Sequence, residues 1–160
     1  MTQAQQAIAA KSERPVIALG FSFESAGRTV TESDIVSFAC LSGDYNRLHV
    51  DAEYARTAAF GQRIAHGLLV LSILSGLTTQ SSGYRALEPN IVALKELSCR
   101  FPKPTFIGDT IHVKVTVVDK TASAKPGRCE ITFRREAINQ RGEVVVQADF
   151  KMLMREEITT

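Results

Sequence analysis

The stretch that most constrains the fold runs from residue 65 to about residue 79. It consists mainly of Leu, Val, Ile, Ser and Gly, so a helix formed here is apolar on nearly every side. Such a helix is stable only where other parts of the protein cover it all round. The sequence therefore predicts one buried helix, enclosed by this chain or partly by a second subunit.

The second half of the chain predicts the sheet that covers this helix. From Ile111 to Val117, β-branched residues alternate with more polar ones, the period of a strand with one buried face. Turn residues at 123–127 and 140–142 make consecutive strands antiparallel. The other strands are predicted at 90–101, 129–139 and 143–155. We therefore expect an α+β fold with an antiparallel sheet wrapped around a central buried helix.

The first half of the chain predicts shorter elements. A strand is expected over 16–24 and an extended piece over 28–30. Thr31 and Asp34 resemble a capping box, which starts a helix that runs to about residue 41. Asp51 caps a second short helix. We expect residues 1–14 to be a flexible N-terminal arm and residues 15–160 to be a single domain.

Composition narrows the class of protein. The 160 residues suffice for one core, and a net charge of +2 is too small to indicate a nucleic-acid partner. Cys40, Cys99 and Cys129 are widely spaced and predict neither a disulfide framework nor a zinc site. No apolar run approaches the ~20 residues that span a bilayer. We expect a soluble cytoplasmic protein without a nucleic-acid or membrane partner.

A polar loop before the buried helix carries the first candidate site residues. Asp44 and His49 are five residues apart, which separates them by about 140° on a helix and by about 16 Å on a strand. An irregular loop can bring them together, because Gly43 permits an unusual backbone and Asn46 can hydrogen-bond neighbouring amides. We predict that Asp44 and His49 act together and that Asn46 supports the loop.

The start of the buried helix carries the second part of the candidate site. Gly67 lies where backbone N–H groups have no intrahelical partner, so its amide can stabilise a developing oxyanion. For His66 we favour a capping or packing role. Ser75 and Thr78 fall on the same stripe of the helix as Gly67 and are read as the wall of a pocket.

Other catalytic signatures are missing from the sequence. Neither Ser72 nor Ser75 lies in a G-x-S-x-G elbow, and no glycine-rich nucleotide loop occurs. The three histidines lack the spacing of metal ligands. We therefore expect no metal and no separate cofactor.

Taken together, these motifs resemble the MaoC-like, (R)-specific enoyl-CoA hydratase family. The resemblance runs from about residue 31 to the C-terminus. The family's usual Pro after the Asn is Arg47 here, which loosens the loop or introduces a charged contact near its mouth. The motifs that carry the resemblance are Ser42-Gly43-Asp44-Tyr45-Asn46-Arg47-Leu48-His49-Val50-Asp51, Tyr54-Ala55-Arg56, Phe60-Gly61, Ile64-Ala65-His66-Gly67, Phe101-Pro102-Lys103-Pro104 and Gly108-Asp109-Thr110.

The resemblance implies a hot-dog fold, a homodimer or larger assembly, and hydration of a trans-2-enoyl-CoA to an (R)-3-hydroxyacyl-CoA. CoA is then part of the substrate. It also implies Asp44 and His49 as the catalytic pair, Gly67 as the oxyanion donor, and Ser75 and Thr78 as acyl-pocket residues. The alternatives are the same chemistry on a branched or dicarboxylic acyl-CoA, for which Arg47 could pair with a carboxylate, a non-catalytic acyl-CoA-binding module, or a thioesterase.

Overall fold

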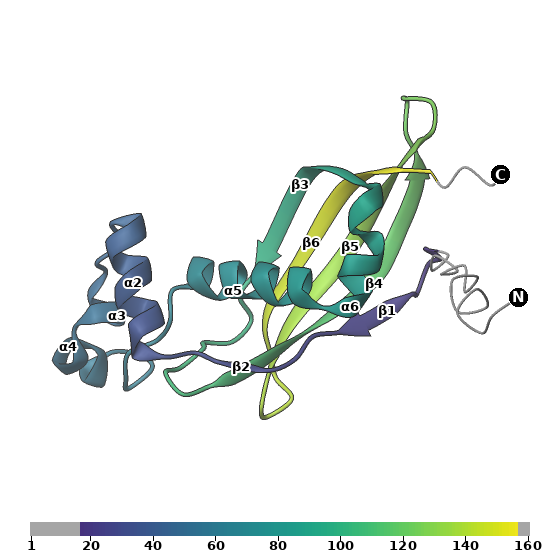
Figure 1. Cartoon of the computed structure of the whole chain (residues 1–160). Coiled ribbons are helices and arrows are strands. Elements are labelled where there is room, and N and C mark those ends of the chain that lie inside the picture. The colour runs from purple at the N-terminus through teal and green to yellow at the C-terminus, as the bar shows by residue number, and fades with distance from the viewer. Residues whose placement is uncertain (1–16, 157–160) are drawn as a thin grey trace, which may run out of the picture.

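A computed structural model describes residues 17–156. They form one six-stranded antiparallel sheet with helix α5 lying across it (Figure 1). The strand order is β1-β4-β5-β6-β3, and β2 also pairs with β4. The strands are β1 (Ser22–Glu24), β2 (Arg28–Thr29), β3 (Ile91–Arg100), β4 (Thr110–Ala122), β5 (Arg128–Asn139) and β6 (Val144–Arg155). The expected hot-dog arrangement of a sheet around a central helix is present.

The helices precede most of the sheet in the sequence. The long central helix begins two residues later than the apolar run and ends close to its predicted end. The predicted arm, residues 1–14, lies outside the described residues. The helices are α2 (Glu32–Ser42), α3 (Arg47–Val50), α4 (Ala52–Thr57), α5 (Gly67–Gln80) and α6 (Ser82–Leu87), followed by the 3-10 turn η1 (Glu88–Asn90).

The core lies between α5 and the sheet. Along β4 and β5, alternate residues are buried, as the period-2 pattern predicts. The buried face of α5 carries Leu69, Val70, Ile73, Leu74, Leu77 and Thr78. This chain leaves one side of the helix open, since Leu68 is 61% exposed and Ser72 is also exposed, which agrees with the second of the two predicted alternatives.

Three features of the local structure differ from the predictions. The first strand is only three residues long, and the predicted irregular loop contains the single turn α3. The segment after α5 continues as α6, because the Ser81 hydroxyl accepts a hydrogen bond from the N–H of Tyr84 and caps a new helix. A Ser-Ser-Gly sequence indicated a turn here, whereas Ser81 ends one helix and starts another.

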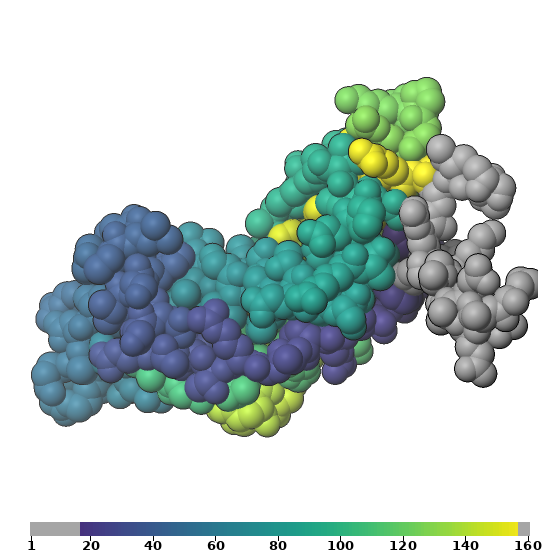
Figure 2. Space-filling view, in the orientation of Figure 1, coloured from purple at the N-terminus to yellow at the C-terminus, as the bar shows by residue number. Residues whose placement is uncertain are grey.

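Helices α2, α3 and α4 form a lobe that projects from one end of the sheet (Figure 1). The space-filling view shows a recess between this lobe and β3, with α5 beneath it (Figure 2). The predicted capping box is confirmed, since Thr31 accepts from the N–H of Asp34 and the Asp34 carboxylate accepts from the N–H of Thr31. This cap fixes where α2 starts, and α2 leads directly into the candidate site.

Candidate active site

The loop that carries Asp44 and His49 is ordered by backbone capping. Gly43 ends α2 with a φ of 75°, a left-handed conformation that favours glycine. The Asp44 carboxylate then accepts a hydrogen bond from the N–H of Asn46 at 3.2 Å. Asn46 in turn caps α3 by accepting from the N–H of Leu48 at 3.0 Å. Asn46 therefore supports the loop, and α3 turns His49 back toward Asp44.

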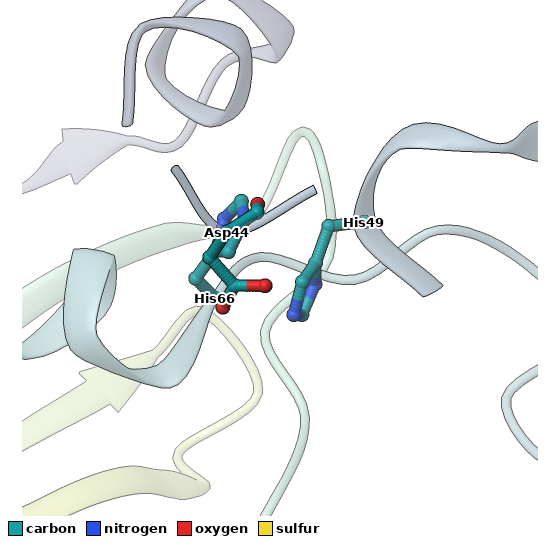
Figure 3. A group of neighbouring side chains, drawn as sticks. All are labelled: Asp44, His49 and His66. Carbon is teal, nitrogen blue, oxygen red and sulfur yellow. The ribbon is translucent and has the colours of Figure 1, made fainter. Parts of the chain in front are cut away.

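Asp44, His49 and His66 meet at one place (Figure 3). One polar atom from each side chain lies within 4.8 Å of the others, although His66 comes from the start of α5. Figure 3 shows the Asp44 carboxylate directed toward the His49 ring. The loop thus brings Asp44 and His49 together, as predicted from their spacing.

The orientation of His49 is fixed by a backbone carbonyl. Its Nδ1 lies 2.8 Å from the carbonyl oxygen of Ile64, an atom that can only accept, so Nδ1 carries a proton and donates. In the neutral ring, Nε2 then has a free lone pair. His49 lines the cavity described below, so this lone pair belongs to the site and can take a proton from bound water.

His66 packs behind Asp44 and His49. It is 2% exposed, and its ring centroid lies 3.8 Å from that of His49. Its Nε2 donates to the main-chain carbonyl of Asp44 at 3.0 Å, while its Nδ1 has no hydrogen-bond partner. It occupies the N-cap position of α5 without a side-chain capping bond. Its contacts are those of a packing residue that also holds the Asp44 backbone.

Gly67 is the first residue of α5, and no side chain caps this helix. The N–H groups of the first turn therefore keep their hydrogen-bonding capacity for a ligand, at the positive end of the helix dipole. A Cβ built on Gly67 would come within 2.9 Å of the Phe101 ring. A larger residue would therefore require this half-exposed ring to move.

A cavity of about 450 Å³ opens beside Gly67 and His49. Its lining is mostly apolar, which suits an acyl chain. Asp44 lies just outside this lining, next to His49. The lining residues are His49, Phe60, Ile64, Ala65, Gly67, Leu68, Val70, Phe101, Pro102, Lys103, Pro104, Thr105, Val145 and Val146.

Three other predicted site residues lie elsewhere. Ser75 and Thr78 are not among the lining residues of this cavity, and the buried Thr78 hydroxyl donates to the carbonyl of Leu74 within α5. Their role in an acyl pocket remains a prediction. Arg47 is paired with Asp51 at 2.9 Å and lies 4.3 Å above the Tyr54 ring, so both contacts occupy the guanidinium that was a candidate receptor for a substrate carboxylate.

The wall of the cavity is fixed by a network that sequence reasoning did not find. The buried Asp109 accepts hydrogen bonds from the Phe106 N–H, from Gln140 and from Arg141. Burial alone would raise the pKa of Asp109, but these hydrogen bonds, led by Arg141, outweigh burial and hold the pKa below its ordinary value. The Gly108-Asp109 motif was the sequence signal for this network. Its role could not be read from the motif alone, because the partners of Asp109 lie some 30 residues later in the chain.

Within residues 17–156, Asp44, His49 and His66 form the one cluster of three side chains of the types that bind metal ions. One ring nitrogen of each histidine is bonded to a main-chain carbonyl, Nδ1 of His49 to that of Ile64 and Nε2 of His66 to that of Asp44. The expectation that no metal takes part stays a prediction.

The comparisons identify the fold and the family. The MaoC-like domain model matches residues 17–137. An (R)-specific enoyl-CoA hydratase of Rhodospirillum rubrum is 35% identical over 130 residues, which is 81% of this chain and 83% of that protein. The crystal structure of the MaoC-like dehydratase from Rhodospirillum rubrum has a TM-score of 0.79 at 33% identity, over 88% of this chain and 94% of that one.

A further relative shows that the domain also occurs in longer proteins. Protein MaoC of Klebsiella aerogenes is 39% identical over 102 residues, which is 64% of this chain but only 29% of that protein. The relatives compared over most of their length carry hydratase or dehydratase names, which agrees with the chemistry that the resemblance implies. With its fold, its paired Asp44 and His49 and a matching model over most of its length, this chain belongs to the MaoC-like domain family.

Proposed function

We propose that the protein is a hydro-lyase that reversibly adds water to a trans-2-enoyl-CoA to give an (R)-3-hydroxyacyl-CoA. The observation that carries the proposal is the meeting of Asp44, His49 and the uncapped start of α5 at one end of an apolar cavity. The two Rhodospirillum rubrum proteins named above, an enoyl-CoA hydratase and a MaoC-like dehydratase, support the same reaction.

The geometry supplies each group that hydration needs. A water held between the Asp44 carboxylate and the His49 Nε2 loses one proton to this pair, and its oxygen forms a bond to the β-carbon. The electron pair of the α,β double bond moves toward the thioester carbonyl, whose oxygen gains negative charge. The Gly67 amide stabilises that charge, and the pair returns one proton to the α-carbon. The product is the 3-hydroxyacyl thioester, with no other reactant consumed.

The test uses purified protein and trans-2-butenoyl-CoA. We expect loss of the conjugated enoyl absorbance and a product that is oxidised by an (R)-specific, and not by an (S)-specific, 3-hydroxyacyl-CoA dehydrogenase. Release of free thiol without hydration would indicate a thioesterase. Binding of the thioester without turnover would indicate an acyl-CoA-binding module. Either result would overturn the proposed reaction.

We also propose that the working unit is at least a homodimer, formed along β3. This strand is at the edge of the sheet and is exposed on both faces, with unpaired backbone groups along one side. Val92, Leu94 and Leu97 are 38%, 50% and 42% exposed, a large apolar surface for a free edge. Leu68 and Phe101 at the cavity are also exposed, so a second copy here would enclose the site.

Charge on this edge should separate the subunits. Leu97→Glu places like charges near the proposed contact, so we expect the protein to change from dimer to monomer at micromolar concentration in sedimentation equilibrium. Val118→Glu is the matched control, because Val118 is similarly exposed on β4, which β5 and β6 separate from β3. A monomeric wild-type protein, or equal dissociation of both variants, would contradict the β3 interface.

We place the protein in the cytoplasm. Cys40, Cys99 and Cys129 are all free thiols, and burial raises the pKa of the Cys99 and Cys129 thiols. Free cysteines support a reducing compartment. No helix in residues 17–156 is long and apolar enough to cross a membrane.

A further inference from the structure

The cavity has one unusual lining residue. Apart from His49 at its catalytic end, its side chains are apolar except for Thr105, which is 4% exposed, and Lys103, which is exposed. Lys103 is therefore the only Lys or Arg among the lining residues. A cation on the wall of an apolar cavity fits a ligand with an apolar end inside and an anionic end outside.

The backbone conformation at Lys103 is restricted although this residue lies in a loop. Pro102 and Pro104 flank it, and each proline restricts its own φ and the conformation of the residue before it. The next residue, Thr105, accepts a hydrogen bond from the Ala65 N–H at 2.8 Å, which ties this loop to the segment leading into Gly67. The backbone of Lys103 is thus held close to the segment that leads into the oxyanion donor.

Lys103 has no ion-pair partner within 4 Å among residues 17–156. The nearby arginines of the projecting lobe are paired with carboxylates. These pairs are Arg47 with Asp51, Arg56 with Glu53, and Arg63 with Glu32.

Glu143 is a carboxylate whose pKa is affected by the charge of Lys103. The pKa of Glu143 is held below its ordinary value first by hydrogen bonds from Asn139 and Arg141, and Lys103 adds to this only as a more distant charge. Because Glu143 is engaged by those two side chains at 2.9 Å, the Lys103 ammonium remains available to an external anion.

We propose that Lys103 binds a phosphate group of the thiol that carries the acyl chain. This inference rests on the proposed function, since it assigns the recognition of the substrate's carrier to a residue outside the catalytic pair. A phosphorylated pantetheine thiol has the required form, with the acyl thioester at one end and phosphate at the other. Both CoA and an acyl-carrier protein present this phosphate, and the experiment separates it from the nucleotide phosphates that only CoA carries.

The experiment compares trans-2-butenoyl thioesters of CoA, of 4′-phosphopantetheine and of pantetheine without phosphate. For Lys103→Gln we expect kcat/KM on CoA to fall about tenfold, mainly through KM, because a charge-assisted contact is lost. The pantetheine thioester should be affected less than twofold. The difference between wild type and variant on CoA should shrink at high salt, and Lys103→Arg should retain most of the activity.

Two controls separate binding from structure. Lys125→Gln removes an exposed lysine from the turn between β4 and β5 and should change none of the three rates. An equal fall of Lys103→Gln on all three thioesters would indicate a structural role and overturn the proposal, as would no fall on any of them. A fall on both phosphorylated thioesters assigns the contact to the pantetheine phosphate, and a fall on CoA alone assigns it to the nucleotide phosphates.

Failure of the proposed function has a different signature. If the wild-type protein hydrates none of the thioesters, the reaction is wrong, and calorimetry then tests Lys103 by itself. In that case we expect CoA to bind wild type about tenfold more tightly than Lys103→Gln, and pantetheine to bind both alike. Equal affinities of both proteins for CoA would overturn the Lys103 assignment.

Discussion

Replacing Asp44 by Asn is expected to lower the rate of enoyl-CoA hydration by about 10²–10⁴-fold, the usual contribution of a positioned acid or base. Asn has nearly the same shape and can still accept the hydrogen bond from the Asn46 N–H, so the loop should survive. What it lacks is the ability to take a proton. The measurement is the steady-state loss of enoyl absorbance, with circular dichroism to show that the fold is kept.

His49→Ala should have an effect of the same order, because it removes the lone pair that the Ile64 carbonyl orients. If the two residues act as one unit, the double variant should be little worse than either single variant. Glu53→Gln and His112→Gln are the controls. The first changes a carboxylate to an amide and the second removes a histidine, both away from the cavity. Activity near that of wild type in Asp44→Asn or His49→Ala would remove the basis for the catalytic pair.

Patterns that depend on local chemistry were predictable from the sequence. The alternation along β4 and the capping box at Thr31 were confirmed because period-2 burial and helix capping involve residues close in the chain. The same holds for the Asp44 to His49 loop, where Gly43 and Asn46 occupy the expected roles. These elements position the catalytic pair.

Features that depend on distant contacts were not predictable. The cavity beside Gly67 is also lined by Pro102 and by Val145 on β6, while the acyl-pocket role of Ser75 and Thr78 remains a prediction. A stripe defines one wall only, and the second wall is set by strands far along the chain.

The open side of α5 illustrates the same limit at the level of assembly. Its apolar run predicted that this chain or a second subunit covers it, and this chain by itself leaves Leu68 exposed. The sequence could state that the helix needs covering, whereas only the arrangement of β3 indicated where a second copy can supply the cover. The residue types of α5 therefore predicted that the helix is buried, but they did not indicate which surface covers it.

The largest stability effect is expected for Asp109→Asn, at about 3 kcal/mol at pH 7, because the amide replaces one buried acceptor oxygen by an NH2 donor that faces the donors of its partners. The Asp109 side chain is only 4% exposed and accepts bonds from Phe106, Gln140 and Arg141. At fixed protein concentration this corresponds to a Tm lower by roughly 6–12 °C for a chain of this size. Thermal unfolding followed by circular dichroism measures it.

The pH dependence of this difference has a definite sign. Because the pKa of Asp109 is lower in the folded than in the unfolded protein, its contribution is fully present above the unfolded value, near 4, and is lost as pH falls through the lower folded value. The Tm difference between wild type and Asp109→Asn should therefore be constant from about pH 5 to 7 and shrink below about pH 4.

Glu143→Gln is the control for this network, because it alters an exposed carboxylate that contacts the same Arg141. It should lower the Tm much less than Asp109→Asn does, because solvent-accessible ion pairs contribute little to stability. Equal losses for the two variants, or a difference that grows as pH falls, would contradict the account of Asp109. The predicted contrast follows from burial: water can replace a lost contact at Glu143 but not at the buried position 109, whose side chain also anchors, through the Phe106 N–H, the loop that carries Lys103.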